Sequence, residues 1–184
     1  EACSLTSVEA ALRSFGITAS YCRRRGLVVF REPERLTEVA EHGGTFRLVP
    51  GAAEAWVRMR KCAADESVRV GLVSAYRSIE HQVSLIERKI GAGCTVDEAL
   101  EVLAPPGCSE HHTGRAVDIC TPGCAPLDET FEGTAAFEWL TGHAAAFGFC
   151  LSYPRNNPQG FVYEPWHWCW RCGDAAAITG QRPV

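Results

Sequence analysis

The chain has 184 residues, enough for one domain with its own core, and a composition (46% hydrophobic, 22% charged) typical of a globular protein. A formal net charge of −4, with no long block of lysine or arginine, argues against a nucleic-acid partner. No apolar run approaches the roughly 18 to 20 residues that cross a bilayer, so we expect no membrane span.

The ten cysteines are the strongest compositional signal. A dense, even set of cysteines favours disulfides formed outside the cytoplasm. The chain also begins at Glu1 without a charged and apolar leader, as it would after removal of a signal peptide. We therefore predict a disulfide-stapled, periplasmic or secreted protein.

The cysteine spacing suggests which bridges form. We predict at least four of the five bridges that ten cysteines allow, with Cys120–Cys124 as the favoured local pair, because Pro122 and Gly123 provide a tight turn. A four-thiolate zinc site is the alternative, and it would leave six cysteines unexplained. Its ligands would be Cys120, Cys124, Cys169 and Cys172.

The first half of the chain alternates between helical and extended patterns. Residues 1–44 read as an extension, with a helix that Gly16 ends and a β-branched strand at Leu27–Phe30. Apolar residues at helical spacing predict a helix over residues 51–64, and alternating valine and leucine predict a half-buried strand over residues 67–76. Two more helices are expected, at about 79–90 and 95–103.

The second half follows a break at Pro105–Gly107. One helix and three strands are predicted there: a strand over 115–120, a helix over 134–147, and strands over 148–153 and 161–168. The short spacing of the last two strands favours an antiparallel pair. We therefore predict an α+β fold in a single domain, with a small antiparallel sheet flanked by helices. The domain would span residues 1–184, with its motifs in a core over about 45–172.

Two short stretches carry the candidate chemistry. The first, "SEHHTGRAVDI", contains His111 and Asp118, and the second, "YEPWHWCW", places Glu164 three residues before His167. A catalytic zinc needs three protein ligands and one open position. His111 and Asp118 can supply two ligands from a turn and the strand after it, and His167 can supply the third from a neighbouring strand. Glu164 beside the metal would then be the general base of a metallopeptidase.

For the remaining histidines and for three tryptophans, we predict positions without a catalytic role. His112 is expected at the rim of the pocket or on the surface, because adjacent strand residues face opposite ways. His42, His81 and His143 have no accompanying motif and are expected on the surface. The three tryptophans within residues 166–170 are interpreted as a buried strand face that shields the metal, rather than as a stacking platform for bases.

The same stretches resemble the signatures of the VanY-type D-alanyl-D-alanine carboxypeptidases, zinc LAS metallopeptidases that trim bacterial cell-wall peptides. "SEHHTGRAVD" matches Ser-x-His-x-x-Gly-x-Ala-x-Asp, and "EPWH" matches Glu-x-x-His. "SAYRSIEHQ" resembles the family's third motif, and "GFCLSYP" resembles a strand that precedes the Glu-x-x-His element. These matches run from about Val70 to Trp170, whereas the first 45 or so residues match no motif.

The resemblance implies a role for each matching residue of the metal site. Zinc would be held by His111, Asp118 and His167. Glu164 would deprotonate the attacking water and deliver the proton to the leaving amine.

The resemblance also implies substrate contacts. Arg77 would stabilise charge on the scissile carbonyl oxygen or hold the terminal carboxylate of the substrate, and its planar, permanently charged guanidinium suits either role. Ser109 and Gln82 match positions that hydrogen-bond the substrate carboxylate. From the residues alone, Ser109 could equally cap a turn, and Gln82 could face solvent.

The predicted function is a zinc-dependent carboxypeptidase that removes the C-terminal D-alanine from peptidoglycan stem peptides, a D,D-carboxypeptidase. Two alternatives keep the same scaffold: an L,D-carboxypeptidase that acts on a tetrapeptide, and a peptidoglycan endopeptidase. A third is a non-catalytic peptidoglycan- or zinc-binding module. The retention of Glu164 beside His167 argues against the third, because a pure binder needs no base.

Overall fold

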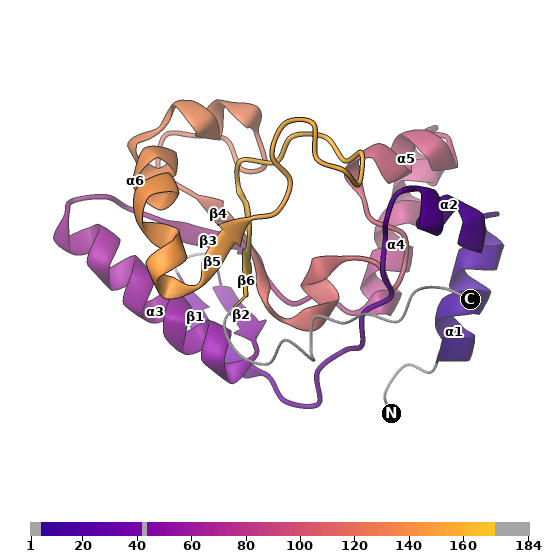
Figure 1. Cartoon of the computed structure of the whole chain (residues 1–184), viewed down its shortest axis with the longest axis horizontal. Helices are drawn as coiled ribbons and strands as arrows, with labels where there is room; N and C mark the ends of the chain where they lie inside the picture. The colour runs from indigo at the N-terminus through magenta and orange to yellow at the C-terminus, as the bar shows by residue number, and fades with distance from the viewer. Residues whose placement is uncertain (1–4, 42–43, 172–184) are drawn as a thin grey trace.

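The computed structural model of the chain describes residues 5–41 and 44–171, and combines helices with small antiparallel sheets. Figure 1 shows the larger sheet with helices packed on one side and a separate group of helices on the other. Each side has its own cluster of buried apolar residues. The predicted α+β class, with a small antiparallel sheet flanked by helices, is confirmed.

The larger sheet holds the strands that carry the metal-ligand candidates. Its four strands lie in the order β3-β4-β6-β5, and each adjacent pair is antiparallel. In this register Asp118 of β4 lies directly opposite His167 of β6. A bulge between Leu72 and Ser74 brings Ser74 of β3 opposite Asp118 on the other side. The strands are β3 (Gly71–Ser74), β4 (Ala116–Cys120), β5 (Phe149–Leu151) and β6 (His167–Trp170).

Two helices cover this sheet and complete the first core. Helix α3 (Pro50–Asp65) begins with a proline, whose fixed φ suits the first turn, and buries Trp56 and Met59. Helix α6 (Ala135–His143) is capped by the Thr134 side chain and buries Leu140. A hairpin of β1 (Thr37–Glu41) and β2 (Gly44–Leu48) packs on α3.

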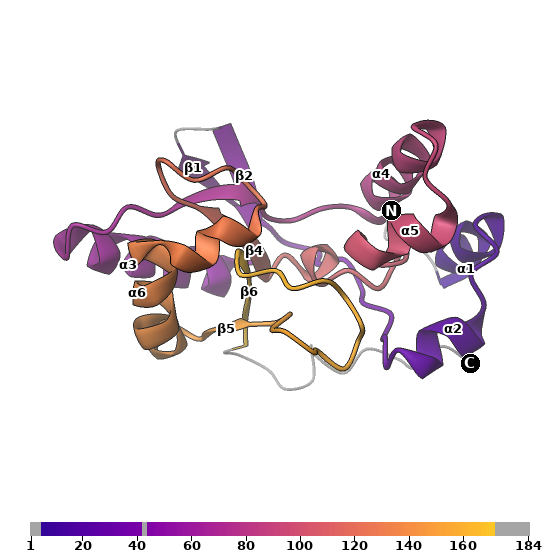
Figure 2. The ribbon, with the colours of Figure 1, turned by 90° about the horizontal axis from the view of Figure 1, so that it is seen from above.

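The second core is helical. Four helices contribute to it: α1 (Leu5–Ser14), α2 (Ala19–Arg24), α4 (Ile79–Gly91) and α5 (Val96–Val102). Seen from above, these helices lie together at one end of the molecule, apart from the sheet (Figure 2). Leu12 of α1 and Ile86 of α4 are among its buried residues. Side-chain caps at Thr18, Ser78 and Thr95 begin three of the helices.

Three short 3-10 turns connect these elements. They are η1 (Glu110–Thr113), η2 (Glu129–Gly133) and η3 (Ala144–Phe147). Gly114 ends η1 with a φ of 64°, and a Cβ built there would lie 2.8 Å from the Leu36 side chain. Only glycine fits both the left-handed backbone and the close approach, so the motif glycine turns the chain from His111 into β4.

Several predicted elements are shorter than expected or are wrong. Residues Leu27–Phe30 form no strand beyond an isolated bridge at Val29, whereas the hairpin of β1 and β2 was missed. The last strand begins at His167, because residues 161–166 form a loop. Pro165 in that loop has no N–H for a sheet ladder. Short apolar runs do not by themselves distinguish a strand from a packed loop.

The disulfide prediction is wrong in this structure. The eight cysteines between residues 5 and 171 are all free, and Cys120 is not bonded to Cys124. The Cys124 sulfur instead lies 3.5 Å from the Ala125 carbonyl oxygen and from the Thr130 hydroxyl. Cys3 and Cys172 lie outside the described residues, and the eight free thiols mean that the structure does not contain four bridges.

The buried cysteines have a packing role that composition does not reveal. Cys22 and Cys108 are buried in the helical core, and Cys169 is buried in β6. A free cysteine in such a position acts as a small apolar side chain. The four-thiolate zinc alternative includes Cys172, which lies outside the described residues. Among the described residues, the group that could hold a metal contains no cysteine.

The remaining histidine predictions have mixed outcomes. His81 and His143 are exposed, as predicted, and His42 lies outside the described residues. Of the three tryptophans predicted to form a buried strand face, Trp168 is buried and its ring packs on Phe137 of α6 (6.3 Å between centroids), whereas Trp166 and Trp170 are half-buried. Among the described residues, no helix is long and apolar enough to cross a membrane.

Candidate active site

Three predicted ligands converge at the sheet edge. His111 comes from η1, Asp118 from β4 and His167 from β6, and one ligand atom from each lies within 4.8 Å of the others. All three side chains are buried. Two imidazole nitrogens and one carboxylate oxygen are a typical donor set of catalytic zinc, which keeps a further position open for the reaction. The residues present therefore fit a zinc ion.

Hydrogen bonds determine which nitrogen His111 can offer to a metal. Its Nδ1 lies 2.6 Å from the Ala75 carbonyl oxygen, an acceptor, so Nδ1 carries the proton. Its Nε2 lies 3.2 Å from Asp118 Oδ2. Burial lowers the pKa of His111, despite the nearby Asp118 carboxylate. His111 therefore presents a free Nε2 lone pair to the cluster.

In His167 the nitrogen beside Asp118 is Nδ1, whereas in His111 it is Nε2. The His167 Nδ1 lies 3.1 Å from Asp118 Oδ1, and its Nε2 lies 3.0 Å from Glu110 Oε2. Burial disfavours the charged imidazole, but hydrogen bonds to Asp118 and Glu110 outweigh it and raise the pKa of His167 to about 10. Burial alone would raise the pKa of Asp118, but His111 and His167 hold it well below its usual range.

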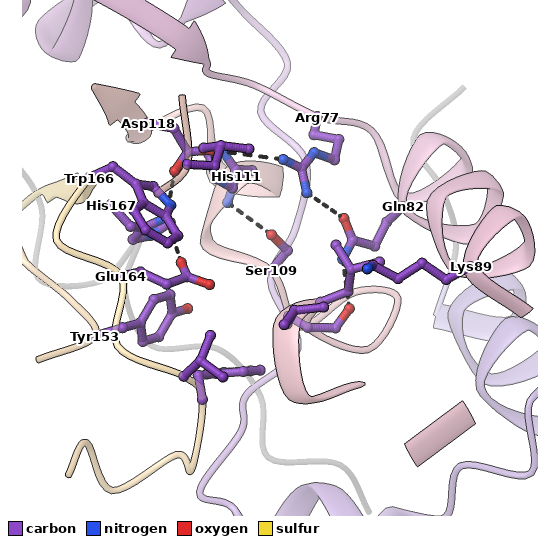
Figure 3. A pocket seen from close by; sticks show the side chains of 16 residues that line it. Arg77, Gln82, Lys89, Ser109, His111, Asp118, Tyr153, Glu164, Trp166 and His167 are labelled. Carbon is purple, nitrogen blue, oxygen red and sulfur yellow. Dashed lines mark hydrogen bonds and ion pairs between the residues drawn. The ribbon is translucent and has the colours of Figure 1, made fainter. Parts of the chain in front are cut away.

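Glu164 lies beside the three ligands and faces the cleft (Figure 3). Its Oε2 is 3.8 Å from His167 Nδ1, and its side chain is 13% exposed. Burial raises its pKa to about 7, although His167 and Arg77 favour the ionised form. A carboxyl group with a pKa near neutrality can both accept and return a proton, which suits general acid–base catalysis.

Arg77 lies in the loop between β3 and α4 and lines the same cleft as Glu164. Its Nη1 donates to Gln82 Oε1 at 3.0 Å, and its Nη2 donates to Ser74 Oγ at 3.2 Å. The same Nη2 lies 4.0 Å from Asp118 Oδ2. Burial lowers the pKa of Arg77, and the nearby carboxylates of Asp118 and Glu164 oppose this shift. The guanidinium is thus held next to the three metal-ligand candidates.

Gln82 is fully buried rather than exposed to solvent. Its carbonyl oxygen accepts from Arg77, and its amide donates to the Ala104 carbonyl oxygen at 2.7 Å. The residue therefore fixes the Arg77 side chain. Its predicted contact with substrate stays a prediction.

Ser109 caps a turn, which was one of the two roles predicted for it. Its hydroxyl accepts from the His111 backbone N–H at 3.3 Å at the start of η1. It also lines the cleft, so a substrate contact stays a prediction.

The prediction that His112 lies at the rim or surface is wrong. The residue is fully buried. Its Nδ1 donates to the Arg77 carbonyl oxygen at 2.7 Å, and its Nε2 accepts from the Gly107 N–H at 3.3 Å. Burial lowers its pKa to about 4. His112 therefore links the Arg77 segment to the loop before η1, because η1 is a 3-10 turn and not the extended strand that the prediction assumed.

The cleft between the two sides has a volume of about 340 Å³. Figure 3 shows Glu164, Tyr153 and Trp166 on the side of the metal ligands, and Arg77, Gln82 and Lys89 on the helical side. Leu103 and Val162 add apolar walls. The candidate metal donors His111, Asp118 and His167 line the same cleft.

Sequence reasoning missed two residues of this region. Tyr153 places its ring 4.7 Å from the His167 ring, between centroids, and lines the cleft. Glu110 Oε2 lies 3.0 Å from His167 Nε2, the ring nitrogen on the opposite side from Asp118. Tyr153 lies in "GFCLSYP" and Glu110 in "SEHHTGRAVD", both noted motifs, but no spacing rule assigns either residue a contact.

Comparisons with known proteins agree with this geometry. The family model of VanY, described as D-alanyl-D-alanine carboxypeptidase, matches residues 45–174. Protein YodJ of Bacillus subtilis (strain 168) is 35% identical over 119 residues, which are 63% of this chain and 43% of YodJ, so the chain spans less than half of that relative. The bifunctional D-Ala-D-Ala dipeptidase and D-Ala-D-Ala carboxypeptidase VanXYC of Enterococcus gallinarum is 29% identical over 74% of each chain.

A solved structure extends the likeness to the fold. The LD-carboxypeptidase LdcB is 31% identical, with a TM-score of 0.66 over 76% of this chain and 69% of LdcB. The family match covers more than half of the chain and includes all three ligand candidates, Glu164 and Arg77. The chain therefore belongs to the VanY family of D-alanyl-D-alanine carboxypeptidases.

Proposed function

We propose that the protein is a zinc-dependent carboxypeptidase that removes the C-terminal D-alanine from peptidoglycan stem peptides. The observation that carries this proposal is the convergence of His111, Asp118 and His167 beside Glu164 in one cleft. Membership of the VanY family supports the same substrate class. A non-catalytic binding module is disfavoured, because it would not need a buried carboxyl group beside the ligands.

His111, Asp118 and His167 would hold the zinc ion. Zinc, when bound, would supply a Lewis acid that polarises the scissile carbonyl and acidifies water. Glu164 takes the proton of the attacking water as its oxygen bonds to the carbonyl carbon. When the C–N bond breaks, Glu164 passes that proton to the nitrogen, so a free amine leaves.

Arg77 supports an exopeptidase rather than an endopeptidase. Its guanidinium reaches the cleft next to Ser109 and is held by Gln82, so it can pair with a terminal carboxylate or with the developing oxyanion. A carboxylate at the chain end is what distinguishes a carboxypeptidase substrate from an internal bond. We therefore place the leaving residue on the Arg77 side of the cleft.

An L,D-carboxypeptidase is the second candidate. LdcB, described as an LD-carboxypeptidase, is 31% identical to this chain, while VanXYC acts on D-Ala-D-Ala and is 29% identical. Both activities release D-alanine and need the same metal, base and carboxylate contact. The two differ only in the residue before the scissile bond.

The proposed substrate also bears on location. Peptidoglycan lies outside the cytoplasmic membrane, so the proposed activity requires an extracytoplasmic protein. The predicted periplasmic or secreted location thus rests on the substrate, because the described cysteines are free thiols and supply no argument for it.

The deciding experiment uses defined muropeptides and mass spectrometry. We expect pentapeptide to lose one alanine and become tetrapeptide, and a chelator to stop the reaction. Conversion of tetrapeptide to tripeptide instead would identify the L,D activity, and cleavage of cross-linked dimers would identify an endopeptidase. Binding of all three substrates without any product would leave a binding module.

The variant Glu164→Gln separates catalysis from metal binding. It keeps the side-chain shape but removes the base, so turnover should fall by the ~10²–10⁴-fold typical of lost general-base catalysis. Zinc content should not change, because Glu164 is not one of the three ligands. Glu87→Gln, on the exposed face of α4, is the matched control and should leave turnover unchanged. Full activity of Glu164→Gln would place the base elsewhere.

A further inference from the structure

Glu110 is a buried carboxylate that the proposed hydrolysis does not use. It lies in η1 immediately before His111, and its side chain is 10% exposed. Among the described residues that line the cleft there is one glutamate, Glu164, so Glu110 does not face the substrate. Burying a charged carboxylate is costly unless it is paired, and the pairing of Glu110 is therefore informative.

The two oxygens of Glu110 have different partners. Oε2 accepts from His167 Nε2 at 3.0 Å, and Oε1 accepts from Arg171 Nη2 at 2.5 Å. Arg171 also donates to the Ser152 hydroxyl at 3.3 Å. Arg171, which follows β6, thus holds one oxygen of the Glu110 carboxylate. The other oxygen faces the His167 imidazole.

This contact determines which nitrogen His167 can offer to a metal. An imidazole that gives one nitrogen lone pair to a metal carries a single proton, on its other nitrogen, and an ionised carboxylate can only accept a hydrogen bond. The proton therefore lies on Nε2, facing Glu110, and the lone pair lies on Nδ1. That nitrogen is the one 3.1 Å from Asp118 Oδ1, on the side of the ligand cluster. The Ala75 carbonyl fixes the opposite tautomer of His111 in the same way.

We propose that Glu110 is a positioning residue for the metal site, which holds His167 in its Nε2-protonated tautomer and aims Nδ1 at the metal. The inference rests on the proposed zinc site. It assigns two successive residues of one 3-10 turn to the same site, with His111 as a ligand and Glu110 as the support of another ligand. Partners of this kind affect metal affinity by about 10–100-fold when they are removed.

The rival explanation is that Glu110 only neutralises Arg171 and stabilises the fold. Glu41 provides the comparison, because it is a similar carboxylate away from the cluster. Its side chain is 5% exposed, its Oε1 lies 2.8 Å from Arg60 Nη1, and the same oxygen accepts from the Trp56 ring N–H at 2.8 Å. Each glutamate therefore pairs with one arginine and one ring N–H, but only Glu110 contacts a ligand.

The test measures zinc affinity by competition with a chromophoric chelator, for the wild type, Glu110→Ala, Glu110→Gln, Glu41→Ala and His167→Ala. We expect Glu110→Ala to bind zinc about 10–100-fold more weakly than the wild type. Glu110→Gln should lie between the two, because its amide oxygen still accepts from Nε2. Glu41→Ala should lower the melting temperature without changing zinc affinity.

A second readout reports the tautomer directly. Ring ¹⁵N shifts of the zinc-loaded protein should show His167 protonated at Nε2, and Glu110→Ala should speed the exchange of that proton. Zinc affinity of Glu110→Ala equal to the wild type would overturn the inference. If that variant does not fold, unchanged affinity of Glu110→Gln overturns it instead. Equal zinc binding by the wild type and His167→Ala would refute the metal site itself, which is a different failure.

Discussion

The two sides of the cleft position their functional side chains in different ways. On the sheet side, Asp118 and His167 face each other across one strand pair, so regular backbone pairing sets their separation. On the helical side, Arg77 lies in a loop and owes its position to side-chain hydrogen bonds from Gln82 and Ser74. The metal-ligand candidates are thus placed by secondary structure, and the substrate-side cation by a buried polar network.

The two sides also differ in their relation to the family. The family match begins at residue 45, so it includes the larger sheet and the ligand candidates but not α1 and α2. Those helices supply Val8, Leu12 and Cys22 to the core beneath α4 and α5. The extension is therefore part of the fold, and it supports the helical wall of the cleft.

Arg25, just after α2, makes this connection specific. It donates to the carbonyl oxygens of Gln159 at 2.5 Å and Leu100 at 3.0 Å. Its guanidinium also lies 4.3 Å from the centre of the Phe161 ring, and Phe161 lines the cleft. A residue outside the family match thus positions a wall of the proposed substrate site.

The largest expected effect comes from removing a ligand on the sheet side. Asp118→Ala should abolish stoichiometric zinc binding and activity, because it removes one of three donors and leaves two buried imidazoles without their shared carboxylate. Elemental analysis of the purified protein measures the zinc. Asp65→Ala, an exposed carboxylate paired with Lys61 on α3, should retain zinc. Zinc retained by Asp118→Ala would contradict the assignment of this ligand.

A smaller effect is expected from the polar network on the helical side. Gln82→Met removes the acceptor that holds Arg77 and leaves the Ala104 carbonyl unpaired, so the guanidinium should lose its fixed position. Misplacement of about 1 Å can cost roughly 10²-fold in rate, and we expect a loss of up to this size. Steady-state kinetics and zinc content should separate the two sides, because zinc should stay bound.

The control for this variant is a neighbour on the same helix. Ser84→Ala removes an exposed hydroxyl that bonds only within α4, so kinetics should not change. Loss of zinc from Gln82→Met would show that the two sides are coupled through Arg77 and Asp118. Unchanged kinetics would show that Ser74 alone suffices to hold the guanidinium.

The sequence predicted the sheet side better than the helical side. His111, Asp118, His167 and Glu164 were predicted to meet, and the structure brings them together, because their spacing in the sequence corresponds to a turn and two paired strands. The contacts of Gln82 with Ala104 and of His112 with Arg77 were not predictable, because they join residues 22 and 35 positions apart in the chain. The Glu110 contact with His167 spans 57 residues and depends on the strand register.

The disulfide error has a related cause. Composition registers how many cysteines there are, but bonding requires two Cβ atoms at a suitable separation, and only the packed chain sets that distance. The missed hairpin of β1 and β2 is similar. Its strands carry charged residues on the exposed face, which weakens the apolar alternation that identifies a strand.

The smallest expected effect on activity comes from the apolar core of the extension. Leu12 is 7% exposed and packs in the helical core with residues of α4 and α5. Leu12→Ala should lower the free energy of unfolding by about 2–5 kcal/mol, the usual cost of a buried leucine truncation. Denaturant unfolding measures this change, and m-values test whether the two cores unfold together.

The same variant tests whether the extension only stabilises the cleft or also shapes it. Well below its melting temperature, Leu12→Ala should keep zinc content and turnover, because the strands that carry Asp118 and His167 pack in the other core. Val57→Ala, on the exposed face of α3, is the matched apolar control and should change stability by no more than about 0.5 kcal/mol. If Leu12→Ala instead raises KM while turnover and zinc stay normal, the extension shapes the helical wall of the cleft as well as stabilising it. Loss of zinc in parallel with stability would mean that the two cores form one cooperative unit, and the contrast between the two sides would then hold for their chemistry but not for their folding.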